Sequence, residues 1–421
     1  MSSTHLYLAV DVGTASVRVG FFDIHGNCLS SALEKICVFQ SSKFPSQYEQ
    51  NSEEIVKMFK LVATKAYDQV KHLVSNPVVA GVCFGATCSL VFADCEGDPI
   101  TLVSDQNSEG HGNIIMWLDH RAEAETYKIN ATCHEALKFY GDGLSLEMEP
   151  PKLLWVKTHL PLVWDQFSIV LDLADFMTYK ISRSSNIRSL CTMTCKWAYD
   201  APAGDFRKSF WESSGLPDVY SRLLKDSKVC IPGENIPFSY NQDTLGDNLP
   251  TTSTIGISPG IIDAYAGVLG CLATHVEIDG YCLKPVEMGS MISGTSNCLF
   301  VLDDRGDIPP TVSGVWGPFW NVLGNRLWCY EGGQSAAGKL LDWLFEFHSK
   351  GSQMTNEDKN SLIIRLSEMA KAKNLESLHL LSRNIHICPD FHGNRSPLSR
   401  YLNCFPVFNA LKLFNLLLEV T

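Results

Sequence analysis

The sequence predicts an α/β protein with two related lobes, and three observations support this prediction. Apolar strand-like runs alternate with helical patterns along the chain, which is typical of α/β folds. A strand–turn–strand unit near the N-terminus recurs far downstream. The chain has 421 residues, which is too long for one ordinary core because a domain averages roughly 150 residues. We therefore expect two lobes.

The first copy of the repeated unit begins at the N-terminus. The apolar run 6–10 predicts a strand, residues 11–16 predict a tight turn, and residues 17–22 predict a returning strand. In the second copy, residues 291–293 lead through a turn at 294–297 into the apolar run 298–302. Gly13 aligns with Gly294, and Thr14 aligns with Thr295. An internal repeat of this kind predicts two lobes of similar construction.

The segments around these copies follow helical and strand patterns in turn. Helical spacing of apolar residues occurs at 53–75, 133–182, 264–274 and 335–348. Residues 78–84 predict a buried strand. The stretch 228–260 is rich in Pro, Gly, Asn and Ser, and it predicts a connection before the lobe boundary.

Charge and cysteine content exclude several classes of protein. A net charge of −12 and a pI near 5.5 oppose binding to a polyanion, so nucleic acid is not an expected partner. The fifteen cysteines are scattered singly, and their odd number favours reduced thiols over a closed disulfide framework. A basic leader and an apolar run of about 18 residues are both missing from the sequence. We therefore expect a cytoplasmic protein with no transmembrane segment.

The two glycine–threonine turns carry the first functional signal. Backbone N–H groups and hydroxyls of such a turn can point at phosphate oxygens, while Asp11 can hold a hydrated Mg²⁺. A single turn of this type is more often an ordinary hairpin. Two copies favour the functional interpretation, because facing turns can bracket one polyphosphate.

Asp263 carries the second signal. It ends an apolar approach and precedes a helix of small residues, so its carboxylate is expected at a strand end, where α/β folds place ligand groups. The structural alternative is a helix N-cap. Phosphoryl transfer to an alcohol needs a proton acceptor, a metal and donors around the γ-phosphate. Asp263, Asp11 and the two turns would supply these parts.

Five motifs resemble the FGGY family of carbohydrate kinases in type, order and spacing, and within it the ribulokinase branch. They are Asp11 to Arg18, Met116 to Ala122, Asp263 to Gly267, Ser293 to Ser296 and Gly332 to Ser335. The resemblance covers roughly residues 5–400. It implies a duplicated actin-like, ribonuclease-H-like fold with two lobes, an interlobe cleft and an incomplete second lobe. The implied domains are a sugar-binding lobe at 5–268, a partial C-terminal lobe at 269–400 and a non-family tail at 401–421.

The resemblance also implies an activity and its residues. The activity is ATP-dependent phosphorylation of a pentulose, D-ribulose by resemblance, with Mg²⁺ as second cofactor and Asp263 as general base. Nucleotide contacts are implied for Asp11, Gly13, Thr14, Ser16, Arg18, Gly294, Thr295 and Ser296, and metal contacts for Asp11 and Asp263. Sugar contacts are implied for Ala86, Thr87, Trp117, Asp119, Arg121, Lys196, Asp263 and Glu331.

Some of these assignments have structural alternatives that the sequence leaves open. Lys196 and Glu331 could form a surface or interlobe ion pair instead of binding sugar hydroxyls. Trp117, Asp119 and Arg121 could shape the pocket, or they could simply be a buried tryptophan beside an ion pair. A homodimer also stays open.

Two departures from the family bear on function. Gly85 stands in the sugar loop where relatives tend to have an acidic residue, and the family pattern stops near Arg400. The residues after Pro406 predict an amphipathic helix that could dock on the second lobe, bind a partner or lie on a membrane surface.

Two other functions compete with the kinase. A catalytically silent form could bind sugar or a partner without turning over nucleotide. A nucleotide-switched chaperone of the actin-like class is disfavoured, because Lys196 and Glu331 stand in a pocket-like context.

Overall fold

The structure is a computed structural model. It describes residues 3–102, 112–236, 245–246, 249–347, 350–384, 390 and 394–396. The predicted tail at 401–421 lies outside these residues. The chain forms two compact units: unit 1 comprises residues 1–291 and 299–331, and unit 2 comprises residues 292–298 and 332–421. The predicted domain boundaries, which instead divide the chain at residue 268, stay a prediction.

A central mixed sheet dominates unit 1. Its strands follow the order β12–β6–β1–β2–β3, and a short strand, β13, also pairs with β6. The bounds are β1 (Thr4–Val12), β2 (Ser16–Phe22), β3 (Cys28–Lys35), β6 (Pro77–Ala86), β12 (Thr251–Ile257) and β13 (Ile261–Ile262). β1 runs antiparallel to β2 and parallel to β6. The predicted strands at 6–10, 17–22 and 78–84 are thus confirmed.

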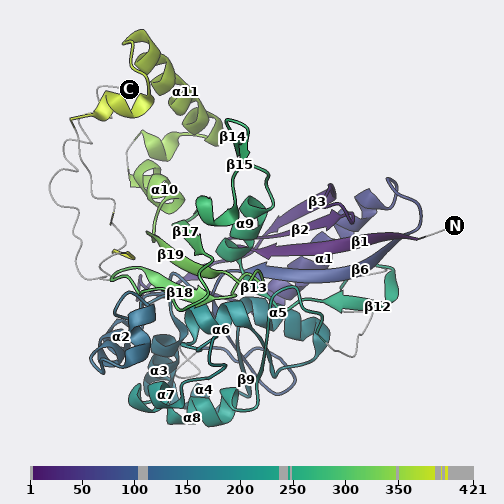
Figure 1. Cartoon of the computed structure of the whole chain (residues 1–421), viewed down its shortest axis with the longest axis vertical. Helices are drawn as coiled ribbons and strands as arrows, with labels where there is room; N and C mark the ends of the chain where they lie inside the picture. The colour runs from purple at the N-terminus through teal and green to yellow at the C-terminus, as the bar shows by residue number, and fades with distance from the viewer. Residues whose placement is uncertain are drawn as a thin grey trace. The chain divides into compact units, whose positions relative to one another are not determined.

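Two helices pack on this sheet. α1 (Ser52–Val70) packs against β2 and β3, and α5 (Leu173–Ser182) packs against β6; Figure 1 shows α1 beside β1, β2 and β3. The Asn51 side chain caps α1 by accepting hydrogen bonds from the N–H groups of Glu53 and Glu54, as expected of Asn at an N-cap. The helical period predicted from the apolar residues is confirmed, because Ile55 and Phe59 on that face are fully buried.

A second sheet and several short helices complete this part of unit 1. The sheet order is β4 (Phe39–Gln40), β5 (Tyr48–Gln50), β8 (Ile114–Ile115), β7 (Leu90–Ala93) and β9 (Ile169–Asp172). The helices are α2 (Glu123–Asn130), α3 (Glu149–His159), α4 (Pro161–Gln166), α6 (Leu190–Lys196), α7 (Lys208–Ser213) and α8 (Pro217–Val219). β10 (Ile187–Ser189) pairs with β11 (Lys228–Cys230).

Two predictions for this region were partly wrong. Residues 133–182 are mostly helical, as predicted, but they also contain β9, a fully buried strand of the second sheet. The stretch 228–260 is more than a connection, because β12 within it joins the central sheet beside β6. Polar and turn-forming residues concealed β12, in which only two of seven residues are buried.

The rest of unit 1 follows α9 (Asp263–Leu272). It includes the hairpin β14 (Glu277–Ile278) and β15 (Tyr281–Cys282). The strands β16 (Gly289–Ser293), β17 (Asn297–Asp303), β18 (Trp316–Trp320) and β19 (Trp328–Gln334) follow, most of whose residues belong to unit 1. Unit 2 contains α10 (Gly338–Phe347) and α11 (Asn356–Ala372). Within the described ranges, every helix is too short or too polar to cross a bilayer.

Candidate active site

Three parallel strand ends meet at one edge of the central sheet. Val12 of β1 lies opposite Ala86 of β6, and Ala86 lies opposite Ile262 of β13. Asp263 follows β13 directly, and because adjacent strands lie about 4.8 Å apart, it is roughly 10 Å from the turn after β1. The predicted base, the Ala86–Thr87 turn and the Gly13–Thr14 turn therefore share one edge of unit 1.

The Gly13–Thr14 turn is held by bonds from three directions. The Gly13 N–H donates to the Ser16 carbonyl at 3.0 Å, and Gln50 Nε2 donates to the Thr14 carbonyl at 2.9 Å. The indole N–H of Trp117 donates to Thr14 Oγ1 at 3.1 Å. Because the hydroxyl accepts this bond, its own hydrogen can be donated to an anion such as a phosphate oxygen.

Asp11 and Arg18 form an ion pair beside this turn. Arg18 Nη1 lies 2.7 Å from Asp11 Oδ2, and both side chains are exposed. Carboxylate oxygens are ligands that Mg²⁺ prefers, and Mg²⁺ keeps several waters, so Asp11 and Asp263 on one sheet edge fit a hydrated ion better than a closed cage. In the ranges that the structure describes, no group of three or more His, Cys, Asp and Glu side chains could hold a metal ion.

Asp263 occupies the first turn of α9. The structure places it as the first helical residue after the N-cap Ile262. Its Oδ1 accepts a hydrogen bond from the N–H of Ala264 at 2.7 Å, and the side chain is partly exposed. The residue therefore lies at a helix N-terminus, where the helix dipole favours a negative charge.

Lys196 and Glu331 lie in a buried group of side chains in unit 1, together with Tyr265 and Trp316. Lys196 ends α6, is 2% exposed, and holds its Nζ 4.6 Å from the ring centre of Trp316. Glu331 is also 2% exposed and accepts a hydrogen bond at Oε2 from the hydroxyl of Tyr265, at 2.9 Å. Trp316 lies opposite Glu331 across β18 and β19. A surface ion pair is therefore excluded for both residues.

Tyr265 and Trp316 are residues of this group for which sequence reasoning proposed no role. Tyr265 follows Asp263 by two positions in α9, and its hydroxyl fixes one oxygen of Glu331. Burial raises the pKa of this phenol well above its ordinary value, with Cys195 and Glu331 acting in the same direction, so it stays protonated and donates. The Asp263-Ala264-Tyr265 motif could have indicated a role for Tyr265, whereas no sequence signal indicated one for Trp316.

The Ala86–Thr87 turn is also rigid and buried. The N–H of Thr87 donates to the Val12 carbonyl at 3.0 Å, and its hydroxyl lies 3.0 Å from that of Ser89. Gly85 lies opposite Asp11, and a Cβ added there would meet its nearest atoms at 3.6 Å, an ordinary contact. A small side chain would therefore fit where this chain has glycine.

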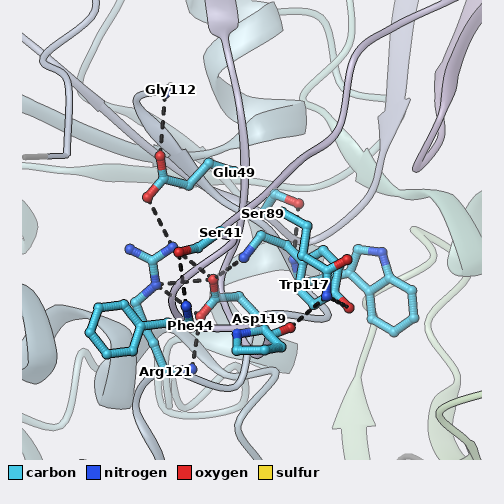
Figure 2. Close-up of polar contacts among 11 residues, drawn as sticks. Ser41, Phe44, Glu49, Ser89, Gly112, Trp117, Asp119 and Arg121 are labelled. Atoms are coloured by element: carbon cyan, nitrogen blue, oxygen red, sulfur yellow. Dashed lines mark hydrogen bonds and ion pairs between the residues drawn. The ribbon is translucent and has the colours of Figure 1, made fainter. Parts of the chain in front are cut away.

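Asp119, Arg121 and Glu49 form a closed ionic network next to Trp117 (Figure 2). Arg121 Nη2 lies 2.8 Å from Asp119 Oδ2 and 3.0 Å from Glu49 Oε1. Asp119 also accepts the N–H of Tyr48 at 2.6 Å. Burial works against the charge of Arg121, but Asp119 and Glu49 outweigh it and raise the arginine pKa. We shall call these residues the Arg121 network.

The sequence left open whether Trp117, Asp119 and Arg121 shape the sugar pocket or form a buried tryptophan beside an ion pair, and these contacts bear on that question. Arg121 bonds to both Asp119 and Glu49, and the Trp117 N–H donates to Ser89 Oγ at 3.2 Å while the indole donates to Thr14. The contacts describe an ion pair that holds the Trp117 segment against the Gly13–Thr14 turn. Contact of Asp119 and Arg121 with sugar stays a prediction.

A second buried pairing of a basic and an acidic side chain lies on α3. Glu149 and Lys152 are completely buried, and Lys152 Nζ lies 3.4 Å from Glu149 Oε2. Among the described residues, no aligned hydrogen bond reaches Nζ or either glutamate oxygen. Burial raises the pKa of Glu149 to about 8; Lys152 opposes this rise, and Asp172 adds to it. The α3 pair therefore contains a carboxyl group that is largely protonated at neutral pH.

Unit 2 contains the second glycine–threonine turn. The N–H of Gly294 donates to the Ser296 carbonyl at 2.8 Å, which resembles the bond of Gly13. The N–H groups of Ala337 and Gly338 donate to the carbonyls of Thr295 and Gly294 at 2.8 and 3.0 Å. A Cβ at Gly338 would lie 2.6 Å from the Gly294 oxygen, so this close approach requires glycine. The turn is thus fixed against the start of α10.

Comparison with known proteins identifies this combination of turns and acidic residues. The model of the N-terminal domain of the FGGY family of carbohydrate kinases matches residues 6–224, and that of the C-terminal domain matches residues 289–401. The chain belongs to the FGGY family of carbohydrate kinases. This confirms the resemblance inferred from the motifs, and it makes the chain a member of a phosphotransferase family whose acceptors are sugar hydroxyls.

Relatives of this FGGY chain include proteins of known activity. It is 34% identical over 407 residues to an FGGY carbohydrate kinase domain-containing protein of Xenopus laevis, and the match covers 93% of the chain and 71% of the relative. It is 34% identical over 430 residues to a D-ribulokinase of Saccharomyces cerevisiae, with 93% of the chain and 58% of the relative covered.

The fold is confirmed by a solved structure. A ligand-bound xylulose kinase of Lactobacillus acidophilus matches with a TM-score of 0.68 at 16% identity, covering 94% of the chain and 71% of the solved protein. The FGGY chain therefore has the actin-like fold of sugar kinases, as the resemblance implied.

Proposed function

We propose that this FGGY kinase phosphorylates a pentulose with ATP, converting D-ribulose to D-ribulose 5-phosphate. The observation that supports the proposal is the register Val12–Ala86–Ile262, which brings Asp263, the Ala86–Thr87 turn and the Gly13–Thr14 turn to one sheet edge. The D-ribulokinase among the relatives supports the choice of sugar. FGGY kinases use ATP, and this supports the choice of phosphoryl donor.

Asp263 would act as the general base. Its carboxylate takes the proton of the sugar hydroxyl as the hydroxyl oxygen forms a bond to the γ-phosphorus. The bond from that phosphorus to the bridging oxygen breaks, and ADP leaves with the electron pair. Mg²⁺, when bound near Asp11 and Asp263, would neutralise the charge of the phosphates.

The remaining residues would bind and orient the reactants. Lys196 donates to sugar hydroxyls, and Glu331 accepts from them with one oxygen fixed by Tyr265. Ala86 and Thr87 line the pocket. Phosphate oxygens would be contacted by Gly13, Thr14, Ser16 and Arg18 in the first turn, and by Gly294, Thr295 and Ser296 in the second. We further propose that the enzyme works in the cytoplasm on a free pentulose.

An activity assay tests the proposal. Purified protein is mixed with ATP, Mg²⁺ and D-ribulose, L-ribulose, D-xylulose or a pentitol in turn, and ADP formation is followed. We expect sugar-dependent ADP formation, fastest with D-ribulose. No turnover with any of these acceptors, in protein shown to be folded by circular dichroism, would refute the proposal. Calorimetry that detected ribulose binding without ATP binding would instead support a silent sugar-binding form.

Tyr265 gives a more specific test of the pocket. Tyr265→Phe removes one hydrogen bond to a carboxylate, a bond typically worth about 1.5–3 kcal/mol. We expect the KM for D-ribulose to rise at least tenfold while kcat changes less, because Tyr265 acts through Glu331 and not on the reacting atoms. An unchanged KM would show that Glu331 needs no orientation by Tyr265. Tyr127→Phe, at an exposed tyrosine of α2, is the matched control.

A further inference from the structure

A groove lies between the N-terminal part of α1 and the C-terminal end of α5, within unit 1. Its volume is about 670 Å³, which falls in the range of roughly 300–1,000 Å³ for small-molecule sites. The apolar floor is formed by Val56 and Leu61, which keep exposed surface; Phe59, Met177 and Ile181 also border the groove but are almost fully buried. The walls carry four cationic side chains, those of Lys57, Lys60, Lys180 and Arg183. We call this feature the α1–α5 groove.

The charge of the groove contrasts with that of the whole chain. The protein has a net charge of −12, yet Glu53 is the one carboxylate among the described residues of the lining. Within the part of the chain that the structure describes, none of the four cations forms an ion pair with a carboxylate. Lys180 Nζ donates only to the carbonyl of Gly97, at 3.1 Å.

The cations are close enough to repel one another. Burial lowers the pKa of Lys180, and the charges of Arg183 and Lys60 act in the same direction, opposed by Asp98 and Glu53. Gathering like charges in a partly buried groove is unfavourable, and an anion bound among them removes this cost. The arrangement thus favours a negatively charged occupant over an empty groove.

The α1–α5 groove is distinct from the candidate active site. α5 begins beside Asp172, which accepts a hydrogen bond from the indole of Trp197, next to Lys196. Lys180 and Arg183 lie towards the other end of this ten-residue helix, roughly 10 and 15 Å away at 1.5 Å per residue. One ligand of sugar size cannot occupy both places.

The geometry points to a binding site for an organic phosphate monoester in the α1–α5 groove. The phosphate lies among Lys60, Lys180 and Arg183, and the organic part lies on the accessible apolar surface of Val56 and Leu61. A phosphate dianion matches several cations at once, and the guanidinium of Arg183 can bind two of its oxygens. The apolar floor distinguishes such an ester from inorganic phosphate, which would leave that surface uncovered.

Calorimetric titration with phenyl phosphate tests this assignment on the full chain. We expect saturable binding that is at least tenfold tighter than that of inorganic phosphate at equal ionic strength. The double variant K60M/R183M should weaken phenyl phosphate binding at least tenfold, and so should K180M alone. Lys128→Met, at an exposed lysine of α2, should bind like the wild type. Thermal unfolding of each variant verifies that it is folded, and R183M alone serves if the double variant is not.

Two results would overturn the assignment. One is the absence of saturable phenyl phosphate binding to the wild-type protein. The other is equal binding to the wild type and the groove variants, which would place the ligand elsewhere, the nucleotide site included. D-ribulose-dependent ADP formation should be the same in K60M/R183M as in the wild type, so failure of the kinase proposal would leave this test unaffected.

Discussion

Unit 1 contains two buried pairings of basic and acidic side chains that differ in how their polar atoms are satisfied. In the Arg121 network, the guanidinium bonds to two carboxylates, and the Asp119 oxygens also accept backbone N–H groups. In the α3 pair, Lys152 approaches Glu149 to 3.4 Å without an aligned hydrogen bond at either group. Burial is nearly complete in both places, so the difference lies in the bonds and not in exposure.

This difference indicates a structural role for the Arg121 network and a change of protonation with pH for the α3 pair. A buried charge that is fully bonded keeps its ionised form, whereas a buried carboxyl without such bonds takes up a proton instead. The Arg121 network therefore acts as a fixed clamp between β5 and the segment of Trp117. The α3 pair, which lies close to Lys196, can change its charge near neutral pH.

The largest effect is expected in the Arg121 network. Arg121→Met leaves Asp119 buried without its main partner, and breaking a buried pair in this way costs about 3–5 kcal/mol. Urea-induced unfolding, followed by tryptophan fluorescence, measures the loss. Lys208→Met, which removes an exposed pair with Glu212, should cost less than about 1 kcal/mol. Equal losses in the two variants would contradict the clamp.

A smaller effect is expected at Lys152. Lys152→Met removes the cation from the α3 pair, but Glu149 can stay protonated, so no buried charge is left behind. We expect a change of no more than about 1 kcal/mol in either direction, well below the loss for Arg121→Met, because no aligned hydrogen bond is lost and the buried lysine charge is removed with its desolvation cost. The same urea titration at pH 7 compares the two variants. A loss at Lys152 as large as that at Arg121 would show that Glu149 is ionised in the folded protein.

The effect of Glu149→Gln should be smallest at low pH, and it should appear mainly as a change in the pH dependence of stability. The folded pKa of about 8 lies above the ordinary value of 4.5, so between these values the folded protein holds a proton that the unfolded chain has lost. This contribution to stability is complete below about pH 4.5 and is lost as the pH rises towards 8. Asp172, Lys152 and Lys196 are the charged groups that act on Glu149.

The substitution should therefore flatten the pH profile of the urea midpoint. Wild type and Glu149→Gln should be similar at pH 5, and the variant should be the more stable at pH 8.5. Some slope should remain, because burial also raises the pKa of Asp175 to about 7. Parallel profiles for the two proteins would show that Glu149 does not titrate in this range.

The sequence predicted the features that depend on local pattern. The repeated turns, the helix at α1 and the strand before Asp263 follow from apolar period and turn residues. β12 and β9 escaped prediction because their place depends on partners far along the chain, β6 for one and β7 for the other. Edge and short strands owe their stability to such pairing more than to their own residues.

The site was predictable in its residue types but not in its contacts. Asp263, Lys196 and Glu331 were identified through motifs, whereas the bond from Tyr265 to Glu331 joins residues on different elements. The burial of Glu149 and Lys152 was equally hidden, since a charged pair at helical spacing is most often a solvated surface feature. The sequence pattern does not show which face of α3 is buried in the folded protein.

The most direct test of the account concerns Asp263 as the base. D-ribulose-dependent ADP formation and calorimetric ribulose binding should be measured for the wild type and Asp263→Asn. We expect kcat to fall about 10²–10⁴-fold, the usual contribution of a general base, while the Kd for ribulose changes only a few-fold. A variant that kept kcat within a few-fold of the wild type would contradict the role of Asp263 and the mechanism built on it.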